Sequence, residues 1–222
     1  MKERIFIEQG IRRMQLEEYL KEQLYRAGFT KAELIKTPMV TRVIVHVVNP
    51  GLAIGKSGQN IKALTEELEK KFNLENVQME IKQIENPILD AQVQADRIKT
   101  YLERGFNWRS VVYRVVKDIM AANAQGVEII VKGKLAGKGG RKKKQRVALG
   151  YIKKVGDQVK LQDFGKAVAY PKPGAIGIKV TIVRPDVIFP DKVDFAEVLK
   201  KEEIEEKKKE KEEKKEEVEK NE

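Results

Sequence analysis

Gly55-Lys56-Ser57-Gly58 is the stretch of this sequence whose residue types are best suited to binding phosphate. Glycine reaches positive φ values and has no Cβ, so a phosphate group can approach the backbone N–H groups of such a loop closely. Lys56 adds a mobile positive charge at the same place. The four residues therefore predict a phosphate-binding loop.

The residues on either side of this loop predict the elements that hold it. An apolar, strand-like run occupies residues 43–48, and a short helix fits between this run and the loop. After the loop, apolar residues recur at helical spacing: Ile61, Leu64, Leu68 and Phe72. A G-x-x-G loop between two helices is the arrangement with which a KH domain holds the backbone of about four nucleotides. The segment resembles such a domain.

Two other interpretations of the loop are open at this point. Gly-Lys-Ser-Gly is also ordinary chemistry for a turn that joins two helices. The run from Gly51 to Ser57 is similar to a P-loop motif, which has four residues between its two glycines before Lys-Ser. In this sequence only three residues lie between Gly51 and Gly55. The phosphate cradle would be one residue short, and no strand ends in a convincing magnesium-binding Asp, so nucleotide hydrolysis is disfavoured.

The charge balance favours a polyanionic partner. The 222 residues include 45 Lys and Arg against 34 Asp and Glu, a net charge of +11. Residues 200–222 hold nine Lys and eleven Glu, so the first 199 residues keep 36 basic and 23 acidic side chains. The part predicted to fold is thus more basic than the whole chain, which suits a polyanion such as nucleic acid.

Several classes of chemistry are excluded or disfavoured by composition. The absence of Cys rules out disulfides, zinc–thiolate sites and cysteine nucleophiles. The single histidine, His46, has no visible catalytic partner and is expected on a strand, at the surface or edge of a sheet. No apolar run approaches the roughly 18 residues of a membrane span, and the N-terminus has no signal core. We expect a soluble intracellular protein without cofactor, metal, catalytic residue or small-molecule substrate.

Hydrophobic periodicity predicts an α/β unit of three strands over residues 1–86. A helix is expected over residues 8–27 and strands over residues 32–36 and 41–48, with a third strand near residues 77–82. The helices are expected to cover one face of the sheet.

A second unit is predicted over residues 87–190. Asn86 and Pro87 have the residue types of a helix start, and this helix is expected to end near Gly105. A second helix from Asn107 has a buried stripe and an opposite face, for which a nucleic-acid contact and an ordinary solvated face are both open. That opposite face carries Ser110, Tyr113, Arg114 and Lys117.

A dense basic stretch follows the second helix, after a strand that alternates from residue 125. Residues 132–146 contain four glycines, which predict a hairpin loop, and no acid occurs between Ile129 and Gly156. Like charges on a glycine-rich loop need counterions, and phosphate is the simplest one, so binding should depend strongly on salt. The eight cations are Lys132, Lys134, Lys138, Arg141, Lys142, Lys143, Lys144 and Arg146.

Three further strands complete the second predicted domain. They are expected over residues 147–154, 164–170 and 176–184, and the turn 171–174 carries Lys172. Two helices would then pack on one face of a largely antiparallel, four-stranded sheet. The Lys/Glu-rich tail, residues 191–222, is expected to be disordered or an exposed helix.

Several motifs in order resemble the family of the universal small-subunit ribosomal protein number three, a KH-containing protein of the subunit head. The resemblance covers about residues 1–190, and the Lys/Glu tail and the uninterrupted Arg141-Lys-Lys-Lys144 resemble its archaeal and eukaryotic branch. The motifs are V-I-V-H-V-V-N-P-G-L-A-I-G-K-S-G-Q-N-I, N-W-R-S-V-V-Y-R-V-V-K, G-V-E-I-I-V-K-G-K-L-A-G-K-G-G-R-K-K-K and A-Y-P-K-P-G-A-I-G-I-K-V-T-I-V.

The resemblance implies an α+β protein with a type II KH domain, the C-terminal domain of the family and a charged tail. It implies a structural role in the small ribosomal subunit: binding of rRNA in the head, contact with neighbouring ribosomal proteins, and a part in the channel by which mRNA enters. The RNA-binding residues would then be the loop 55–58, the cations of residues 132–146, and Arg109, Arg114, Lys117 and Lys172.

One feature of the family is only partly present. In bacterial members, basic residues of the helix that begins R/N-x-S-V oppose mRNA secondary structure. Arg114 falls on one such position, but Val115 and Asp118 occupy the other two, which leaves a helicase-like role in question. A free KH-type RNA regulator and a nucleic-acid-cleaving enzyme or DNA-lesion lyase are the alternatives.

Overall fold

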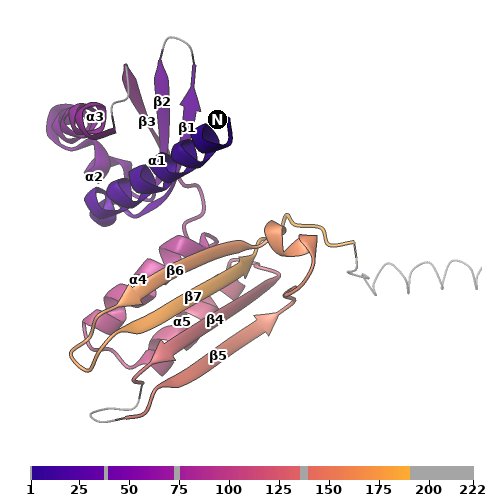
Figure 1. Ribbon diagram of the computed structural model, residues 1–222. Helices are drawn as coiled ribbons and strands as arrows, with labels where there is room; N and C mark the ends of the chain where they lie inside the picture. Colours follow the sequence, from indigo (N-terminus) through magenta and orange to yellow (C-terminus); the bar gives the residue numbers. More distant parts are fainter. Residues whose placement is uncertain (1, 38–39, 73–75, 136–139, 191–222) are drawn as a thin grey trace, which may run out of the picture. The chain divides into compact units, whose positions relative to one another are not determined.

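Two separate β-sheets organise the chain, three strands in the N-terminal part and four in the C-terminal part (Figure 1). The computed structural model describes residues 2–37, 40–72, 76–135 and 140–190. The predicted tail, residues 191–222, and the predicted site residue Lys138 lie outside the described residues. Within the described ranges, no helix is long and apolar enough to cross a membrane.

The N-terminal sheet has the order β1-β2-β3 and contains both kinds of strand pair. Strand β1 (Phe29–Lys36) pairs with β2 (Thr41–Val47) in antiparallel fashion, whereas β2 and β3 (Val77–Gln83) are parallel. A parallel pair needs a crossover connection, and α2 (Pro50–Ile54) and α3 (Gln59–Phe72) supply it. The predicted order of elements and the three-stranded fold class are confirmed.

Helix α1 (Lys2–Gln23) is longer at its start and shorter at its end than the predicted helix over residues 8–27. Phe6 and Ile7 in its first turns are exposed, so the buried stripe of the helix does not extend to them. At the other end, a 3-10 turn (η1, Tyr25–Ala27) follows, and Gly28 adopts a φ of 73°. A Cβ at Gly28 would lie 2.9 Å from a methyl group of Val48. Both this close approach and the positive φ favour glycine at the position where the chain reverses.

One apolar cluster joins the helices of this half to its sheet. Figure 1 shows α1 and α3 beside the three strands. His46 is a strand residue, as expected; it lies on β2, which is the central strand and not an edge, and it is half-buried. The buried members of the cluster include Leu16, Leu20, Leu24, Val43, Val45, Val47, Ala53, Leu64 and Leu68.

The C-terminal sheet is antiparallel throughout, in the order β5-β4-β7-β6. Helices α4 and α5 lie behind it in Figure 1 and pack on one of its faces, which confirms the predicted two-layer domain. The helices are α4 (Ala91–Glu103) and α5 (Trp108–Ala121); the strands are β4 (Gly126–Gly133), β5 (Lys143–Gly150), β6 (Asp163–Ala169) and β7 (Ile176–Val183), with a 3-10 turn, η3 (Asp157–Leu161), before β6.

The start of α4 differs from the prediction. Asp90, not Asn86, caps the helix, because its carboxylate accepts hydrogen bonds from the backbone N–H groups of Gln92 (3.0 Å) and Val93 (3.2 Å). Asn86 instead closes a short turn, in which its carbonyl accepts a bond of 3.2 Å from the N–H of Leu89. Asn86 and Asp90 lie four positions apart and are both suitable capping residues, so the sequence alone does not show which of them caps the helix.

Helix α4 approaches β6 unusually closely at Gly165. A Cβ at Gly165 would lie 2.2 Å from the carbonyl oxygen of Ala91, which is a backbone atom. We predict that Gly165→Ala lowers the free energy of unfolding by about 1–3 kcal/mol, because the helix must shift to admit a methyl group. Urea unfolding followed by circular dichroism measures the change.

Gly10 provides the control for this substitution. It lies within α1, and a Cβ there would meet nothing within 4 Å. Gly10→Ala should therefore raise stability by about 0.5–1 kcal/mol, because alanine favours the helical backbone. If the two substitutions changed stability by the same amount and sign, the close approach at Gly165 would not matter.

Candidate nucleic-acid interface

The predicted phosphate-binding loop contains a short 3-10 turn, η2 (Lys56–Gly58), between α2 and α3. Gly55 has a φ of 72°, Ser57 of 52° and Gly58 of 76°, so three of its four residues are left-handed. Lys56 and Ser57 are exposed. At Gly55 a Cβ would also lie 2.6 Å from the side chain of Asn60, which donates a hydrogen bond to the Leu52 carbonyl. Glycine is thus needed where the chain leaves α2, and a lysine and a serine are presented at the tip.

The same geometry rules against a P-loop. Residues 50–54 form helix α2, so the backbone between Gly51 and Gly55 makes helical bonds rather than wrapping a phosphate. The N–H of Gly55 bonds to the carbonyl of Gly51 at 3.1 Å. A shallow hollow beside the loop is lined by Gly51, Leu52, Gly55, Lys56, Gln59 and Asn60.

The basic stretch of residues 132–146 is only partly a loop. Strand β5 begins at Lys143, not at residue 147 as predicted, so Lys143, Lys144 and Arg146 belong to a strand. The reason is that β5 is an edge strand with both faces largely exposed, where lysines are well tolerated. Lys132 lies in β4, and Lys134, Arg141 and Lys142 are exposed residues of the connection between the two strands.

One of the predicted cations already has a protein partner. Arg146 pairs with the buried carboxylate of Glu128 on β4, and Lys154 lies 3.3 Å from the same carboxylate. Burial raises the pKa of Glu128, but the hydrogen bonds from Arg146 and Lys154 outweigh burial and hold the pKa below its ordinary value. The expectation that the whole basic stretch lacks counter-charge is therefore wrong for Arg146, because the antiparallel pairing of β4 and β5 brings Glu128 diagonally across from it, two positions from its direct partner Ile130.

The register of the C-terminal sheet gathers most of the other cations. Lys132 of β4 pairs with Lys144 on one side and with Gly177 on the other. The connection 134–142 and the turn 170–175 therefore leave the sheet at the same end. Lys172 lies in that turn and is exposed. Segments far apart in the sequence thus present their lysines and arginines at one sheet end.

The start of α5 belongs to this end as well. Asn107 caps the helix by accepting a hydrogen bond of 3.1 Å from the N–H of Arg109. The guanidinium of Arg109 lies 5.4 Å from the ring centre of Trp108. Trp108 and Arg109 line a hollow together with Lys143 of β5. Arg109 and Lys143, two predicted site residues, are thereby brought together.

The outer face of α5 carries the remaining predicted cations. Arg114 and Lys117 are exposed, and Arg114 borders a small apolar hollow with Tyr101 and Phe106. The carboxylate of Asp118 is 3.2 Å from Arg97, so a cation of α4 compensates this acid. The loop 55–58 belongs to the other sheet's domain and forms a separate candidate site.

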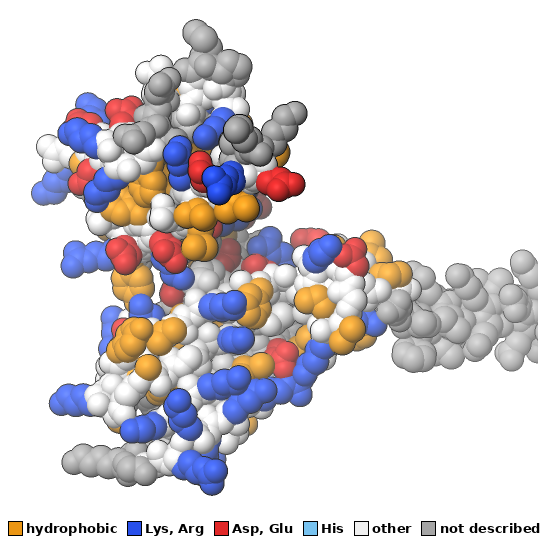
Figure 2. All heavy atoms as spheres, in the orientation of Figure 1, with side chains coloured by type: hydrophobic (Ala, Val, Ile, Leu, Met, Phe, Trp, Pro, Cys, Tyr) orange, Lys and Arg blue, Asp and Glu red, His pale blue; other side chains and the backbone are white. Residues whose placement is uncertain are grey.

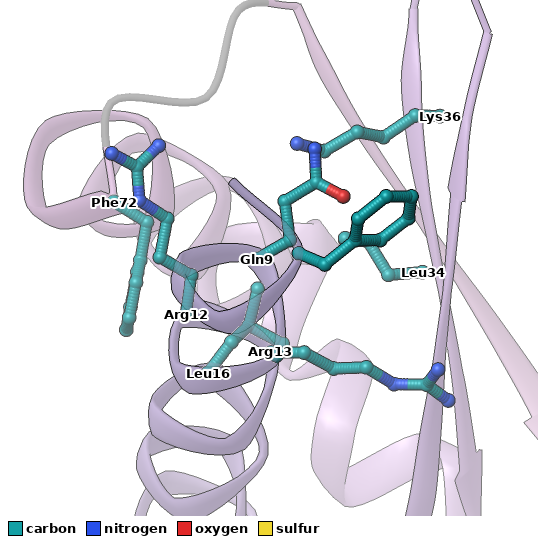
Figure 3. A pocket seen from close by; sticks show the side chains of 9 residues that line it. Gln9, Arg12, Arg13, Leu16, Leu34, Lys36 and Phe72 are labelled. Carbon is teal, nitrogen blue, oxygen red and sulfur yellow. The ribbon is translucent and has the colours of Figure 1, made fainter. Parts of the chain in front are cut away.

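A third kind of hollow differs from these cationic sites. Helix α1, strand β1 and helix α3 enclose a largely apolar groove, seen in Figure 3 with Leu16, Leu34 and Phe72 in its wall. Arg12 and Arg13 also line it. In the described part of the chain, no group of three or more His, Cys, Asp or Glu residues could hold a metal ion.

The Glu128 pair gives a prediction about acid stability. A carboxylate with a lowered pKa in the folded state stabilises the fold above its unfolded pKa and loses that contribution as the pH falls through the folded pKa. The ordinary value is 4.5. Glu128→Gln should cost about 1–2 kcal/mol at pH 7, and the gap from wild type should shrink below about pH 4.5. Urea unfolding at pH 7 and pH 3.5 measures both gaps.

The exposed pair Glu66–Lys70 on α3 serves as the comparison, since both side chains are more than half exposed. Glu66→Gln should change stability little at either pH. A gap for Glu128→Gln that is equally large at pH 7 and pH 3.5 would contradict the assignment.

Comparison with known proteins identifies both halves of the fold. Residues 15–89 match the KH domain family, and residues 98–182 match the family described as ribosomal protein S3, C-terminal domain. A small ribosomal subunit protein uS3 from Methanocaldococcus jannaschii is 41% identical over 198 residues, which cover 89% of this chain and 94% of the relative.

Two other relatives carry the same name. The protein from Methanothermobacter thermautotrophicus is 42% identical over 193 residues, covering 86% of this chain and 74% of the relative. The one from Halobacterium salinarum is 40% identical over 193 residues, covering 86% and 63%. The resemblance drawn from the motifs is thus confirmed, and the chain belongs to the small ribosomal subunit protein uS3 family.

Proposed function

We propose that this protein is a structural component of the small ribosomal subunit, binding rRNA in the head and contributing to the channel by which mRNA enters. The observation that carries the proposal is the gathering of cations from three segments at one end of the C-terminal sheet. Its relatives are named as small ribosomal subunit proteins. The protein would act in the cytoplasm, with rRNA, mRNA and neighbouring ribosomal proteins as partners.

The sheet end is the main rRNA contact in this proposal. Each lysine or arginine that docks on a phosphate releases a condensed cation, so affinity should fall steeply with salt. The exposed cations assigned to it are Lys132, Lys134, Arg141, Lys142, Lys143, Lys144, Arg109 and Lys172, together with Lys138. Arg146 contributes less, because Glu128 already neutralises part of its charge.

The loop 55–58 would supply a second RNA contact. Its left-handed residues leave Lys56 and Ser57 exposed at the tip. Backbone N–H groups and one lysine suit the phosphates of a short single-stranded segment. Gly55 and Gly58 would serve by allowing the RNA backbone close to the chain.

The outer face of α5 is assigned to mRNA. Arg114 and Lys117 are exposed on it, and Tyr113 stands beside them. Asp118 is held by Arg97, so its charge opposes RNA less than the sequence suggests. This face fits contact with the backbone of single-stranded mRNA. Active separation of paired mRNA strands would require cations that Val115 and Asp118 do not supply.

We also propose a division into an RNA-binding KH domain over residues 1–86, a ribosomal C-terminal domain over residues 87–190 and a charged tail over residues 191–222. Support comes from the two apolar clusters, one for each sheet. No residue is assigned a catalytic role.

The loop provides the sharpest test. The variant Lys56→Asp, Ser57→Asp should keep the fold but bind single-stranded RNA about tenfold or more weakly, because it places negative charge where a phosphate would dock. Fluorescence anisotropy with a labelled single-stranded RNA and circular dichroism measure the two properties.

A control of equal charge change is Val155→Asp, Lys160→Asp. Val155 is 83% exposed, and the side chain of Lys160 is 82% exposed. This control should bind RNA nearly as well as wild type. If both variants lost RNA affinity equally, the effect would be one of net charge and not of the loop. Wild-type protein found only in light fractions of a gradient with small subunits would overturn the ribosomal function itself.

A further inference from the structure

The C-terminal sheet has a second face that no helix of the described residues covers. Because side chains alternate along a strand, the buried set Val127, Ile129 and Val131 of β4 faces the helices, and Glu128, Ile130 and Lys132 face the other way. Figure 2 views the molecule from this side, where blue side chains spread over the strands with some orange ones among them. The sequence motifs discussed above do not account for this open face.

The strand register places like charges directly opposite one another on this face. Lys132 of β4 pairs with Lys144 of β5, and Lys166 of β6 pairs with Lys179 of β7. Lysines that face each other across adjacent strands destabilise a sheet. Two such pairs in one four-stranded sheet indicate that the charge serves something other than folding.

The four lysines also lack a counter-charge within the protein. All four are exposed, and none forms an ion pair in the described part of the chain. The only acid that β4 turns to this face is Glu128, which Arg146 and Lys154 already occupy. The face therefore keeps a net positive charge.

Apolar groups lie among these cations. Phe164 and Val168 of β6 are exposed, and Ile130 of β4 is half-buried. The amine of Lys166 lies 5.0 Å from the ring centre of Phe164. In register terms, Phe164 stands beside Thr181 and two residues from Lys166, about 7 Å along the strand. The open face therefore carries four exposed lysines and one exposed aromatic ring.

From this arrangement we propose that the open face of the C-terminal sheet is an RNA-binding surface, on which Lys132, Lys144, Lys166 and Lys179 dock the phosphates of an RNA backbone and Phe164 packs against a ribose or base. The inference rests on the proposed ribosomal function and adds a binding face to it. Lys166, Lys179 and Phe164 are the residues newly assigned.

RNA suits this face better than an acidic protein does. The four strands offer cations at spacings of about 5 Å across the sheet and about 7 Å along it, and a regular run of anions matches this arrangement. An RNA backbone carries phosphates at regular intervals, and its bases and sugars can cover an aromatic ring. Phe164 is the one aromatic residue that the described strands β4–β7 place on this face, so affinity should come mainly from phosphates and show little sequence preference.

Lys179→Glu in the full-length chain separates binding from stability. The new acid lies opposite Lys166 and replaces a repulsive pair by an attractive one, so the melting temperature of the free protein should rise by about 1–3 °C. RNA affinity at 0.1 M salt should fall about tenfold, and the slope of log affinity against log salt should become shallower by about 0.7 on single-stranded RNA.

The probes are a labelled 20-nucleotide oligouridine and an RNA hairpin of similar length, each titrated at several salt concentrations. If Lys179→Glu weakens binding of the hairpin alone, the face binds duplex RNA. If it also weakens binding of oligouridine, the face binds single-stranded RNA, and either result supports the proposal. Lys160→Glu, which makes the same charge change on the exposed turn η3, should leave both affinities nearly unchanged.

The contradicting outcomes are distinct. If wild type binds RNA and Lys179→Glu binds both probes as tightly, the open face is not an RNA surface, although the ribosomal function stands. If that variant keeps its RNA affinity but loses a neighbouring protein in assembled subunits, the face belongs to an acidic protein. If wild type binds neither probe, both proposals fail. Lys179→Gln repeats the test should the acidic variant not fold.

Discussion

Repulsion among the lysines of its sheet is the main physical constraint on the C-terminal domain. Its antiparallel register sets Lys132 against Lys144 and Lys166 against Lys179, and the segments that leave one end of the sheet add further cations. The apolar cluster between sheet and helices must stabilise the fold against this repulsion. A polyanion outside the protein relieves it, and the protein is therefore expected to be more stable when bound to RNA than when free.

The two domains present positive charge in different ways. The KH domain offers a short tip, where left-handed residues at 55, 57 and 58 bring backbone N–H groups and one lysine to the surface. The C-terminal domain presents a broad surface, because the pairing of its strands spreads single cations over the open face of the sheet. A tip suits a few nucleotides of one strand, and a broad surface suits the backbone of a folded RNA. The lysines of edge strand β5 have a second effect, because they discourage pairing of this strand with another sheet.

Much of this could be predicted from the sequence, because the signals were local. The spacing of apolar residues after the loop 55–58 predicted the longer helix, and alternation predicted most strands. Interactions between distant residues could not be predicted. Glu128 lies 18 positions from Arg146 in the sequence, and only the register brings them together. Lys166 and Lys179 look like isolated surface lysines until the strands pair. The cap of α4 was missed because Asn86 and Asp90 are equally suitable by type.

Lysine acetylation of free protein and of assembled small subunits, read by mass spectrometry, tests the central claim most directly. The claim is that RNA supplies the counter-charge for these cations. It predicts that Lys132, Lys144 and Lys172 react readily in the free chain, are protected in the subunit and regain reactivity when the rRNA is digested, while Lys160 reacts alike throughout. Equal reactivity of the three lysines in free and assembled protein would contradict the claim.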